Sequence, residues 1–247
     1  MRLWILIKQD FKNLVTNSTT LTFCFLYPPI LVFLFGFLFS NLYGSSRITS
    51  YDFYGVTMMF YMILGAVTIT PNAFMEERIK QGNLRIAYSP VSRVQIYSSK
   101  LISSFIFMGA TFTIDMLVMQ VCGWVNFGNH NFIYVIGLML VLLAFTVSFG
   151  GAVCVILKSE ELTNKILSII ATAFAVFSGV FFPIAGLGEW ADKISNLSPL
   201  KWVLTTIFQL IYDGGSKYYN IVSFTLISFT LVFIIIVHLN YHPEDYI

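Results

Sequence analysis

Residues 132–157 read FIYVIGLMLVLLAFTVSFGGAVCVIL and contain no charged side chain. A helix needs about 20 largely apolar residues to cross the hydrocarbon core of a bilayer, so this stretch is long enough to span a membrane. Five further runs meet the same criterion: residues 21–42, 54–74, 101–122, 162–182 and 221–239. The sequence therefore predicts an all-α polytopic membrane protein with six transmembrane helices in a single domain, residues 1–247.

The overall composition excludes several other classes of protein. Of the 247 residues, 57% are hydrophobic and 11% are charged, against about one quarter charged in soluble domains. The 25 Phe and 13 Tyr, with a net charge of only +2, argue against a disordered, collagen-like or nucleic-acid-binding chain. Cys24, Cys122 and Cys154 lie singly in apolar stretches, a pattern that favours neither a disulfide framework nor a metal site.

The distribution of basic residues predicts the orientation in the membrane. Ten of the 14 Lys and Arg residues lie before the first run and in the second-to-third and fourth-to-fifth connections. Cytoplasmic loops carry an excess of Lys and Arg, so both termini are expected in the cytoplasm.

Two segments outside the runs are apolar enough to contact the membrane. Residues 1–15 place apolar side chains at helical spacing opposite Lys8, Asp10 and Lys12, which predicts an amphipathic helix lying in the interface plane. Residues 183–219, between the fifth and sixth runs, are apolar but interrupted by Gly and Pro, which predicts short re-entrant helices on the outer side.

No catalytic constellation is present in the sequence. There is no G-x-x-x-x-G-K-[ST] phosphate-binding loop, and the three His residues are not spaced with Cys or carboxylates as metal ligands are. Asp115 is the one carboxylate inside a predicted span. It is either a proton relay or substrate contact, or a neutral group hydrogen-bonded to a neighbouring helix.

The second and fifth runs carry candidate substrate contacts. Thr57 and Thr68 make the second run polar, either for a gate or through hydroxyl groups that bond back to their own helix. Phe174, Phe177 and Phe181 recur at helical spacing along the fifth run and either line an apolar path or face lipid. Ala171, Ala175 and Gly179 form a small-residue stripe that predicts close helix packing.

The connection at residues 76–100 is rich in charge and turn signals. Ser89 followed by Pro90 predicts the start of a short helix, because Pro is favoured at the first helical position. Such a helix between charged segments suits a mechanical contact with a cytoplasmic partner, and it equally suits a solvated interfacial loop.

This connection resembles the inner loop of the ABC-2 family of ABC transporter permeases. The matching residues are Glu77, Arg78, Gly82, Leu84, Ser89-Pro90-Val91-Ser92-Arg93, Tyr97, Lys100 and Leu101. A second similar stretch is Ser178-Gly179-Val180-Phe181-Phe182-Pro183, followed by Trp190 and then Leu197-Ser198-Pro199-Leu200. The resemblance covers nearly the whole chain.

The resemblance implies a membrane subunit of the kind shared with eukaryotic G-subfamily half-transporters. Two permease subunits, identical or different, would surround a path lined by spans two and five, each seated on a separate ATPase subunit that binds ATP and Mg²⁺. The chain itself would be no enzyme and would hold no cofactor. A coupling helix is expected at residues 84–96, with contacts to the ATPase from Glu77, Arg78, Leu84, Ser89, Pro90 and Arg93.

The function that follows is export of an amphipathic drug, peptide or lipid through a bacterial cell membrane. Similarity to the drug- and peptide-exporting branch favours this over export of lipid-linked glycans. A proton-coupled carrier or a membrane-embedded enzyme using Asp115 is the alternative from another class.

Overall fold

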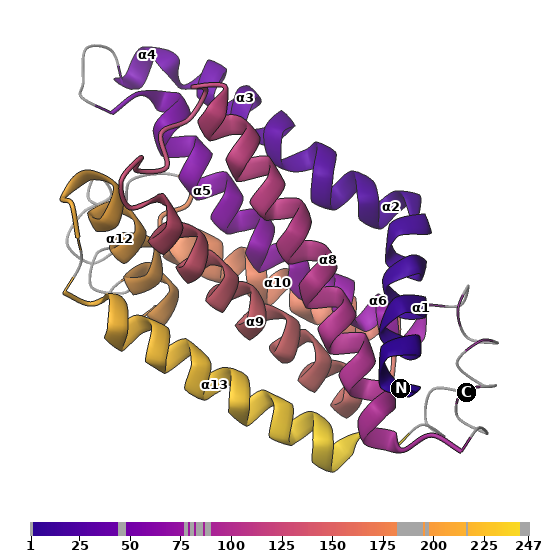
Figure 1. Cartoon of the computed structure of the whole chain (residues 1–247). Coiled ribbons are helices and arrows are strands. Elements are labelled where there is room, and N and C mark those ends of the chain that lie inside the picture. Colours follow the sequence, from indigo (N-terminus) through magenta and orange to yellow (C-terminus); the bar gives the residue numbers. More distant parts are fainter. Residues whose placement is uncertain are drawn as a thin grey trace.

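The computed structural model describes residues 2–43, 48–76, 79, 82, 86, 90–181, 195, 198–215 and 217–242. These residues form helices and the connections between them, and no strand occurs within the described part of the chain (Figure 1). The helices are α1 (Arg2–Thr16), α2 (Ser18–Leu21), η1 (Thr22–Leu26), α3 (Tyr27–Leu38), α4 (Ser40–Tyr43), α5 (Ser50–Gly65), η2 (Ala66–Thr68), α6 (Ile69–Met75), α8 (Arg93–Val121), α9 (Phe132–Leu157), α10 (Glu160–Phe177), α12 (Pro199–Tyr212) and α13 (Tyr219–Asn240). The predicted all-α class is confirmed.

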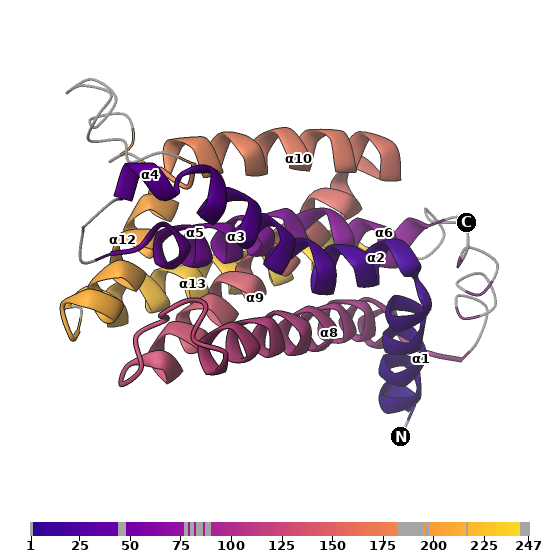
Figure 2. The ribbon, with the colours of Figure 1, turned by 90° about the horizontal axis from the view of Figure 1, so that it is seen from above.

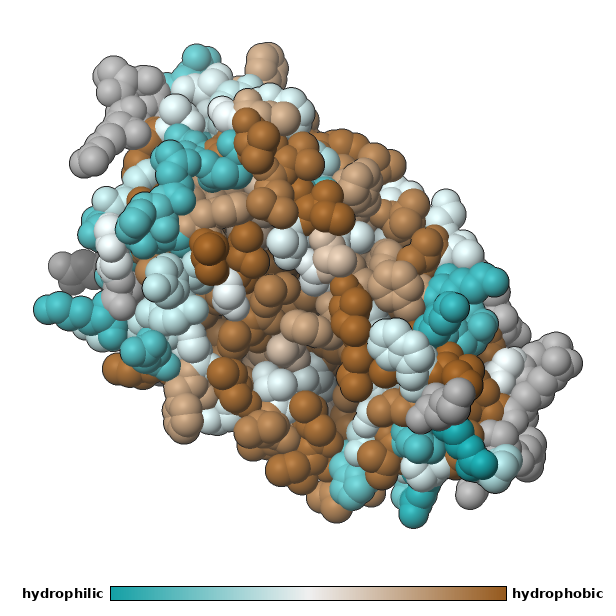
Figure 3. Space-filling view, in the orientation of Figure 1, coloured by the Kyte–Doolittle hydropathy of each residue, from teal (hydrophilic) through white to brown (hydrophobic). Residues whose placement is uncertain are grey.

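Five helical stretches are long and apolar enough to cross a membrane. They are Ser18–Leu38, Ser50–Met75, Arg93–Val121, Phe132–Leu157 and Tyr219–Asn240. On the face shown in Figure 3, a broad apolar band lies between two hydrophilic ends, as expected for a protein surrounded by lipid. The chain is therefore a multi-pass membrane protein. Five of the six predicted runs overlap one of these helices.

The second of these stretches, made of α5, η2 and α6, is the centre of the bundle. In its most apolar 18-residue window, 78% of the residues are buried, against 22% for Ser18–Leu38 and 17% for α13. Figure 2 shows it between α10 on one side and α8 on the other. This central helix is consequently surrounded by protein, whereas the first and last spans are largely exposed on the surface of the bundle.

The central helix is not continuous. It changes to a 3-10 helix at Ala66–Thr68, and Pro71 follows one turn later. Pro71 has no N–H with which to bond the Val67 carbonyl oxygen four residues earlier. Gly150 of α9 packs directly on this oxygen, and a Cβ atom at position 150 would overlap it. The break in the central helix is thus covered by the backbone of a neighbouring helix.

The start of α8 corrects the prediction of a helix beginning at Ser89 and Pro90. Residues 90–92 are not helical, so the expected coupling helix at residues 84–96 is interrupted there, and its last residues are the first turn of α8. Ser92 and Gln95 form a capping box, in which each side chain pairs with the other residue's backbone N–H. The helix therefore begins after Ser92 rather than at Pro90. The third span starts eight residues before the predicted position 101.

The end of α10 corrects the predicted fifth span, which extended to position 182. The helix ends at Phe177, and Gly179 adopts a left-handed conformation with φ of 78°. The N–H of Val180 bonds to the Ala175 carbonyl oxygen at 3.2 Å, and that of Gly179 to Val176 at 3.1 Å, as in a Schellman motif. Ala171 and Ala175 are buried as predicted for close packing, whereas Gly179 serves the helix end.

The amphipathic lead segment forms α1, which runs crosswise to α8 (Figure 2). Ile7, Asp10 and Leu14 share its buried face. Trp4 and Ile5 are largely exposed on the other side. The last turn of α13 reaches the same end of the bundle, because the Tyr97 hydroxyl group lies 2.9 Å from Nδ1 of His238.

We expect Gly150→Ala to destabilise the protein, because its new methyl group would meet the Val67 carbonyl group, which cannot turn away. The matched control is Gly137→Ala on the same helix, where the nearest atom is the movable hydroxyl group of Tyr219 at 3.3 Å. Thermal unfolding in detergent measures both variants. An equal or higher melting temperature for Gly150→Ala would contradict the described contact.

Candidate functional site

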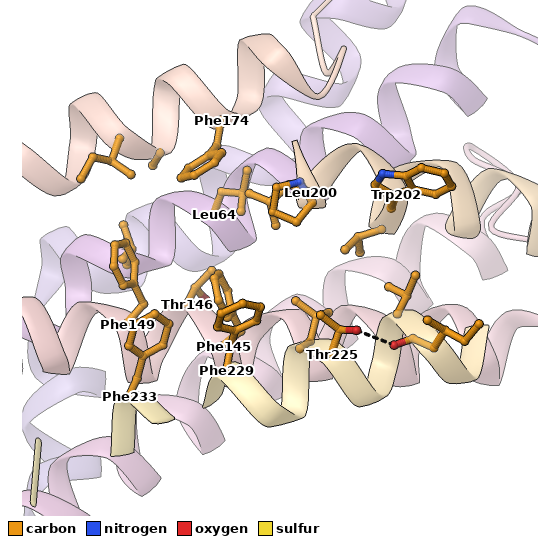
Figure 4. A pocket seen from close by; sticks show the side chains of 18 of the residues that line it. Leu64, Phe145, Thr146, Phe149, Phe174, Leu200, Trp202, Thr225, Phe229 and Phe233 are labelled. Carbon is orange, nitrogen blue, oxygen red and sulfur yellow. Dashed lines mark hydrogen bonds between the residues drawn. The ribbon is translucent and has the colours of Figure 1, made fainter. Parts of the chain in front are cut away.

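An apolar groove of about 500 Å³ runs between α9, α10, α12 and α13 (Figure 4). Leu64 and Val67 of the central helix line it as well. Phe149 and Phe233 lie at one end of the groove, and Trp202 lies at the other. Its volume falls in the range of about 300–1,000 Å³ that is usual for small-molecule sites.

Among the described residues that line the groove, both threonine hydroxyl groups are already hydrogen-bonded. Thr146 donates its hydroxyl hydrogen to the Leu143 carbonyl oxygen at 2.9 Å, and Thr225 donates to the Ile221 carbonyl oxygen at 2.8 Å. Aromatic rings make up much of the remaining wall: Phe145, Phe149, Phe174, Phe229, Phe233, Trp202 and Tyr218. A ligand in the groove would therefore be recognised by apolar contact alone.

The three Phe residues predicted to share one stripe of the fifth span lie in different places. Phe174 lines the groove. Phe177 is 46% exposed and does not line it. Phe181 follows the end of α10, and its ring packs on Tyr61 with centroids 5.2 Å apart. Only the first two are therefore exposed side chains of one helix.

The two threonines predicted for the path also differ. Thr57 is fully buried in α5, and its hydroxyl group has no hydrogen-bond partner in the described part of the chain. Thr68 is half-buried and donates to the Gly65 carbonyl oxygen at 3.0 Å, which is the back-bonding alternative. In this conformation, only Thr68 is near enough to the surface to be reached by a substrate.

A buried polar cluster joins three helices at the opposite end of the bundle from α12. The Asp10 carboxylate group of α1 accepts a hydrogen bond from Ser99 at 2.6 Å and lies 3.7 Å from the Lys100 ammonium group. Lys100 also donates to the Ala73 carbonyl oxygen of α6 at 2.8 Å. Both charges are more than nine-tenths buried. We call Asp10, Ser99, Lys100 and Ala73 the inner polar cluster.

Two further contacts hold the inner end of α6. The Asn17 amide group, between α1 and α2, donates to both carboxylate oxygens of Glu76, at 3.0 and 3.1 Å. On the other side, Asn164 of α10 donates to the Asn72 side chain at 2.8 Å. The segment that ends the central helix is consequently tied to the lead helix, the third span and α10 at once.

The residues expected to contact an ATPase are only partly described. Glu77, Arg78, Leu84 and Ser89 lie outside the described residues. The Pro90 carbonyl oxygen accepts a hydrogen bond from Arg2 at 2.6 Å. The Arg93 guanidinium group lies 3.3 Å from Nδ1 of His242. Pro90 and Arg93 therefore link this connection to both ends of the chain.

Asp115 is buried near the end of α8 that is farther from α1 (Figure 2). One of its carboxylate oxygens has no hydrogen-bond partner among the described residues. No group of three or more His, Cys, Asp or Glu residues in the described part of the chain is arranged to hold a metal ion. Asp115 thus stands apart from the groove and from the inner polar cluster.

Reasoning from the sequence missed the inner polar cluster. The prediction placed Asp10 opposite the apolar face of the lead helix, which is wrong, and it treated Lys100 only as part of the connection at residues 76–100. One signal was available, because Asp10 lies three residues after Ile7 and four before Leu14, on the buried stripe of the lead helix. Its partner, Lys100, is on α8, which is distant in the sequence, and only the tertiary structure identifies this pairing.

The fold defines a multi-pass, all-helical membrane protein. The family model of the ABC-2 type transporter matches residues 1–212, most of the chain. The protein therefore belongs to this family and is a membrane domain of an ABC transporter, a class that works with an ATPase partner. No curated protein matches the chain.

We expect the inner polar cluster to behave as a coupled buried ion pair. Lys100→Met leaves the Asp10 carboxylate group buried without its cation, which typically costs about 3–5 kcal/mol. Asp10→Asn should destabilise by the same mechanism, whereas the double variant should lose less than the sum of the two. Thermal unfolding of the four proteins in one detergent measures this coupling. Additive losses would show that the two charges act independently.

Proposed function

We propose that the protein is the permease subunit of an ATP-driven exporter that moves an amphipathic substrate out of the cell by alternating access. The observation that carries this proposal is the inner polar cluster together with the contact between Asn17 and Glu76. These groups lie where residues 76–92 leave and re-enter the helical bundle. A partner that pushes on this connection would move α1, α6 and α8 together.

The central helix provides a place where such a movement is absorbed. Residues 66–68 are 3-10 helical, and a short stretch of this kind inside a longer helix often marks a hinge. The inner end, α6, carries the contacts to α1, α8 and α10, while α5 carries the outer half. We propose that the inner half tilts about this break when nucleotide binds to the partner.

We infer that α10 also crosses the membrane, as the fifth of six spans along the chain, and that both termini are cytoplasmic. Its 18 residues would span about 27 Å, close to the roughly 30 Å hydrocarbon core. Glu160, Glu161 and Lys165 would then lie at the cytoplasmic surface. On this topology α12 is an outer helix between spans five and six, the place expected for a re-entrant segment.

The assembly we propose is two permease subunits and two ATPase subunits in a bacterial cell membrane, with ATP and Mg²⁺ bound by the ATPases. The substrate path would run between the permeases, past the exposed Phe174 and Phe177 side chains and the half-buried Thr68. Thr57 and Phe181 would shape the wall from inside. The exposed apolar side chains suit a drug, peptide or lipid with an apolar part.

We expect Asn17→Asp to uncouple transport from ATP turnover. The Asn17 side-chain oxygen caps α2 by accepting from the N–H groups of Thr19 and Thr20, and Asp keeps this role. The amide donor to Glu76 becomes a second carboxylate group, so the contact is lost and replaced by repulsion. In vesicles containing the complete complex, substrate transport should fall several-fold while ATP turnover persists.

The control for this experiment is Gln9→Ala, which removes only an exposed hydrogen bond to Asn13 on the same helix. It should transport as the wild type does. The isolated chain, assayed in parallel, is expected to hydrolyse no ATP. Unchanged transport by Asn17→Asp, or ATP turnover by the isolated chain, would contradict the proposal.

The native cysteines test the proposed topology. Cys122 is exposed at the end of α8, whereas Cys24 and Cys154 are buried. An impermeant thiol reagent should therefore label wild-type protein in intact cells, and Cys122→Ser should abolish the label. Glu161→Cys in the Cys122→Ser background places a thiol at an exposed site at the other end and should react only after permeabilisation. The reverse pattern would invert the topology.

A further inference from the structure

We propose that the apolar groove between α10 and α13 binds one acyl chain of a membrane phospholipid, whose headgroup lies at the end formed by Trp202 and Tyr218. Of the side chains placed on the proposed path, only Phe174 also lines this groove, and the inner polar cluster lies apart from it. The chemistry, length and rim of the groove, and the helices that it separates, fit such a lipid.

The chemistry of the groove selects a hydrocarbon chain. The hydroxyl groups of Thr146 and Thr225 are both used by carbonyl oxygens of their own helices. A ligand that brought polar groups deep into the groove would lose its hydrogen bonds to water and gain none. An acyl chain has no such groups, and it gains from every methylene group that it buries.

The groove is long rather than round. Its lining on α13 extends from Tyr218 to Phe233, about 22 Å of helix. One leaflet contributes about 15 Å, half of the hydrocarbon core. A chain that enters at the Trp202 end can therefore lie along the groove over the full depth of its leaflet, with Phe149 and Phe233 at the far end.

The rim carries the side chains of a lipid headgroup boundary. The rings of Trp202 and Tyr218 meet edge to face with centroids 5.9 Å apart, and both side chains are about half exposed. Trp and Tyr are enriched at the level of the headgroups, where one edge is apolar and the other wet. Lys217, next to Tyr218 and exposed, supplies a cation for the lipid phosphate group.

An acyl chain in this position would complete the packing of α10. That helix packs on the central helix and α9, while the groove separates it from α13. Ala171 and Phe174 of α10 line one wall, and Val222 and Leu226 of α13 line another. The lipid would therefore support α10 from the side that protein leaves open.

Two tryptophans of equal exposure allow a direct test with full-length protein in detergent. Trp202 is 47% exposed at the groove, and Trp124 is 46% exposed beside Phe33, away from it. Variants that keep only one of them, with the other three of the four tryptophans replaced by Phe, are titrated with phosphatidylcholine carrying brominated acyl chains. Bromine quenches tryptophan fluorescence on contact. Quenching of Trp202 should saturate near one lipid per protein chain. Quenching of Trp124 should instead rise in proportion to the lipid in the mixture, without saturating.

Thr225→Phe, in the protein that keeps only Trp202, places a ring in the groove and removes no contact between helices. The affinity for lipid, read from the quenching of Trp202, should fall about tenfold. This is the loss expected if two methylene groups of the acyl chain are no longer buried. Ile227→Phe is the matched control, since Ile227 is exposed on α13 and does not line the groove. Its titration should match the unmodified protein.

Coincident titrations of Trp202 and Trp124 would overturn the proposal, as would a Thr225→Phe titration identical to that of the control. If the groove is instead closed by a second copy of the chain, lipid will not quench Trp202 saturably, which also overturns it. The measurement needs no ATPase subunit and no transport, so its failure is distinct from failure of the proposed export function.

Discussion

A backbone carbonyl group that loses its helical donor inside a membrane must be covered by protein, because hydrocarbon cannot hydrogen-bond it. Pro71 creates this demand at Val67, in the middle of the second span. The demand explains why this span is the most buried and why α9 brings a glycine, Gly150, against the break. The remaining helices are arranged around this one.

The same break gives the central helix two halves with different partners. The outer half is held by aromatic packing, as in the stacking of Phe39 on Tyr54 at 5.2 Å. The inner half is held by directed polar contacts, with Lys100 at the Ala73 carbonyl oxygen and Asn164 at Asn72. Apolar packing tolerates small sliding, whereas buried ion pairs are strongly destabilised when one partner is removed. A force applied at the inner end would therefore move α1, α6 and α8 together.

The helix α10 is enclosed along one side only. Its buried residues are Thr163, Leu167, Ala171 and Ala175, a single narrow stripe with small side chains at two positions. Phe174, Val176 and Phe177 remain exposed. A helix held by one stripe depends on whatever covers its other faces, which we propose to be a lipid chain on one side and the substrate path on another. Lipid composition would then be able to modulate the position of a helix that lines the path.

Much of the fold could be predicted from the sequence, because the length of an apolar run and the spacing of polar residues are properties of the chain alone. Five of the six predicted apolar runs coincide with helices long and apolar enough to cross a membrane, and the lead segment predicted the helix α1 but not the burial of Asp10. Local signals were present even where the prediction was wrong. The Ser92 and Gln95 pair starts α8, and Gly179 ends α10, whereas the predictions rested on Pro90 and on the small-residue stripe.

The candidate sites were less predictable, since they depend on contacts between helices that are distant in the sequence. The sequence by itself determined that this chain is a bundle of membrane-spanning helices with a crosswise amphipathic helix at one end. The physical reason is that the backbone polar groups in the hydrocarbon core must be hydrogen-bonded within the protein. Tertiary structure alone decided that Asp10 meets Lys100, 90 residues away, and that α9, α10, α12 and α13 leave a groove between them. Helical periodicity specifies which face of each helix is apolar, and packing decides which faces meet.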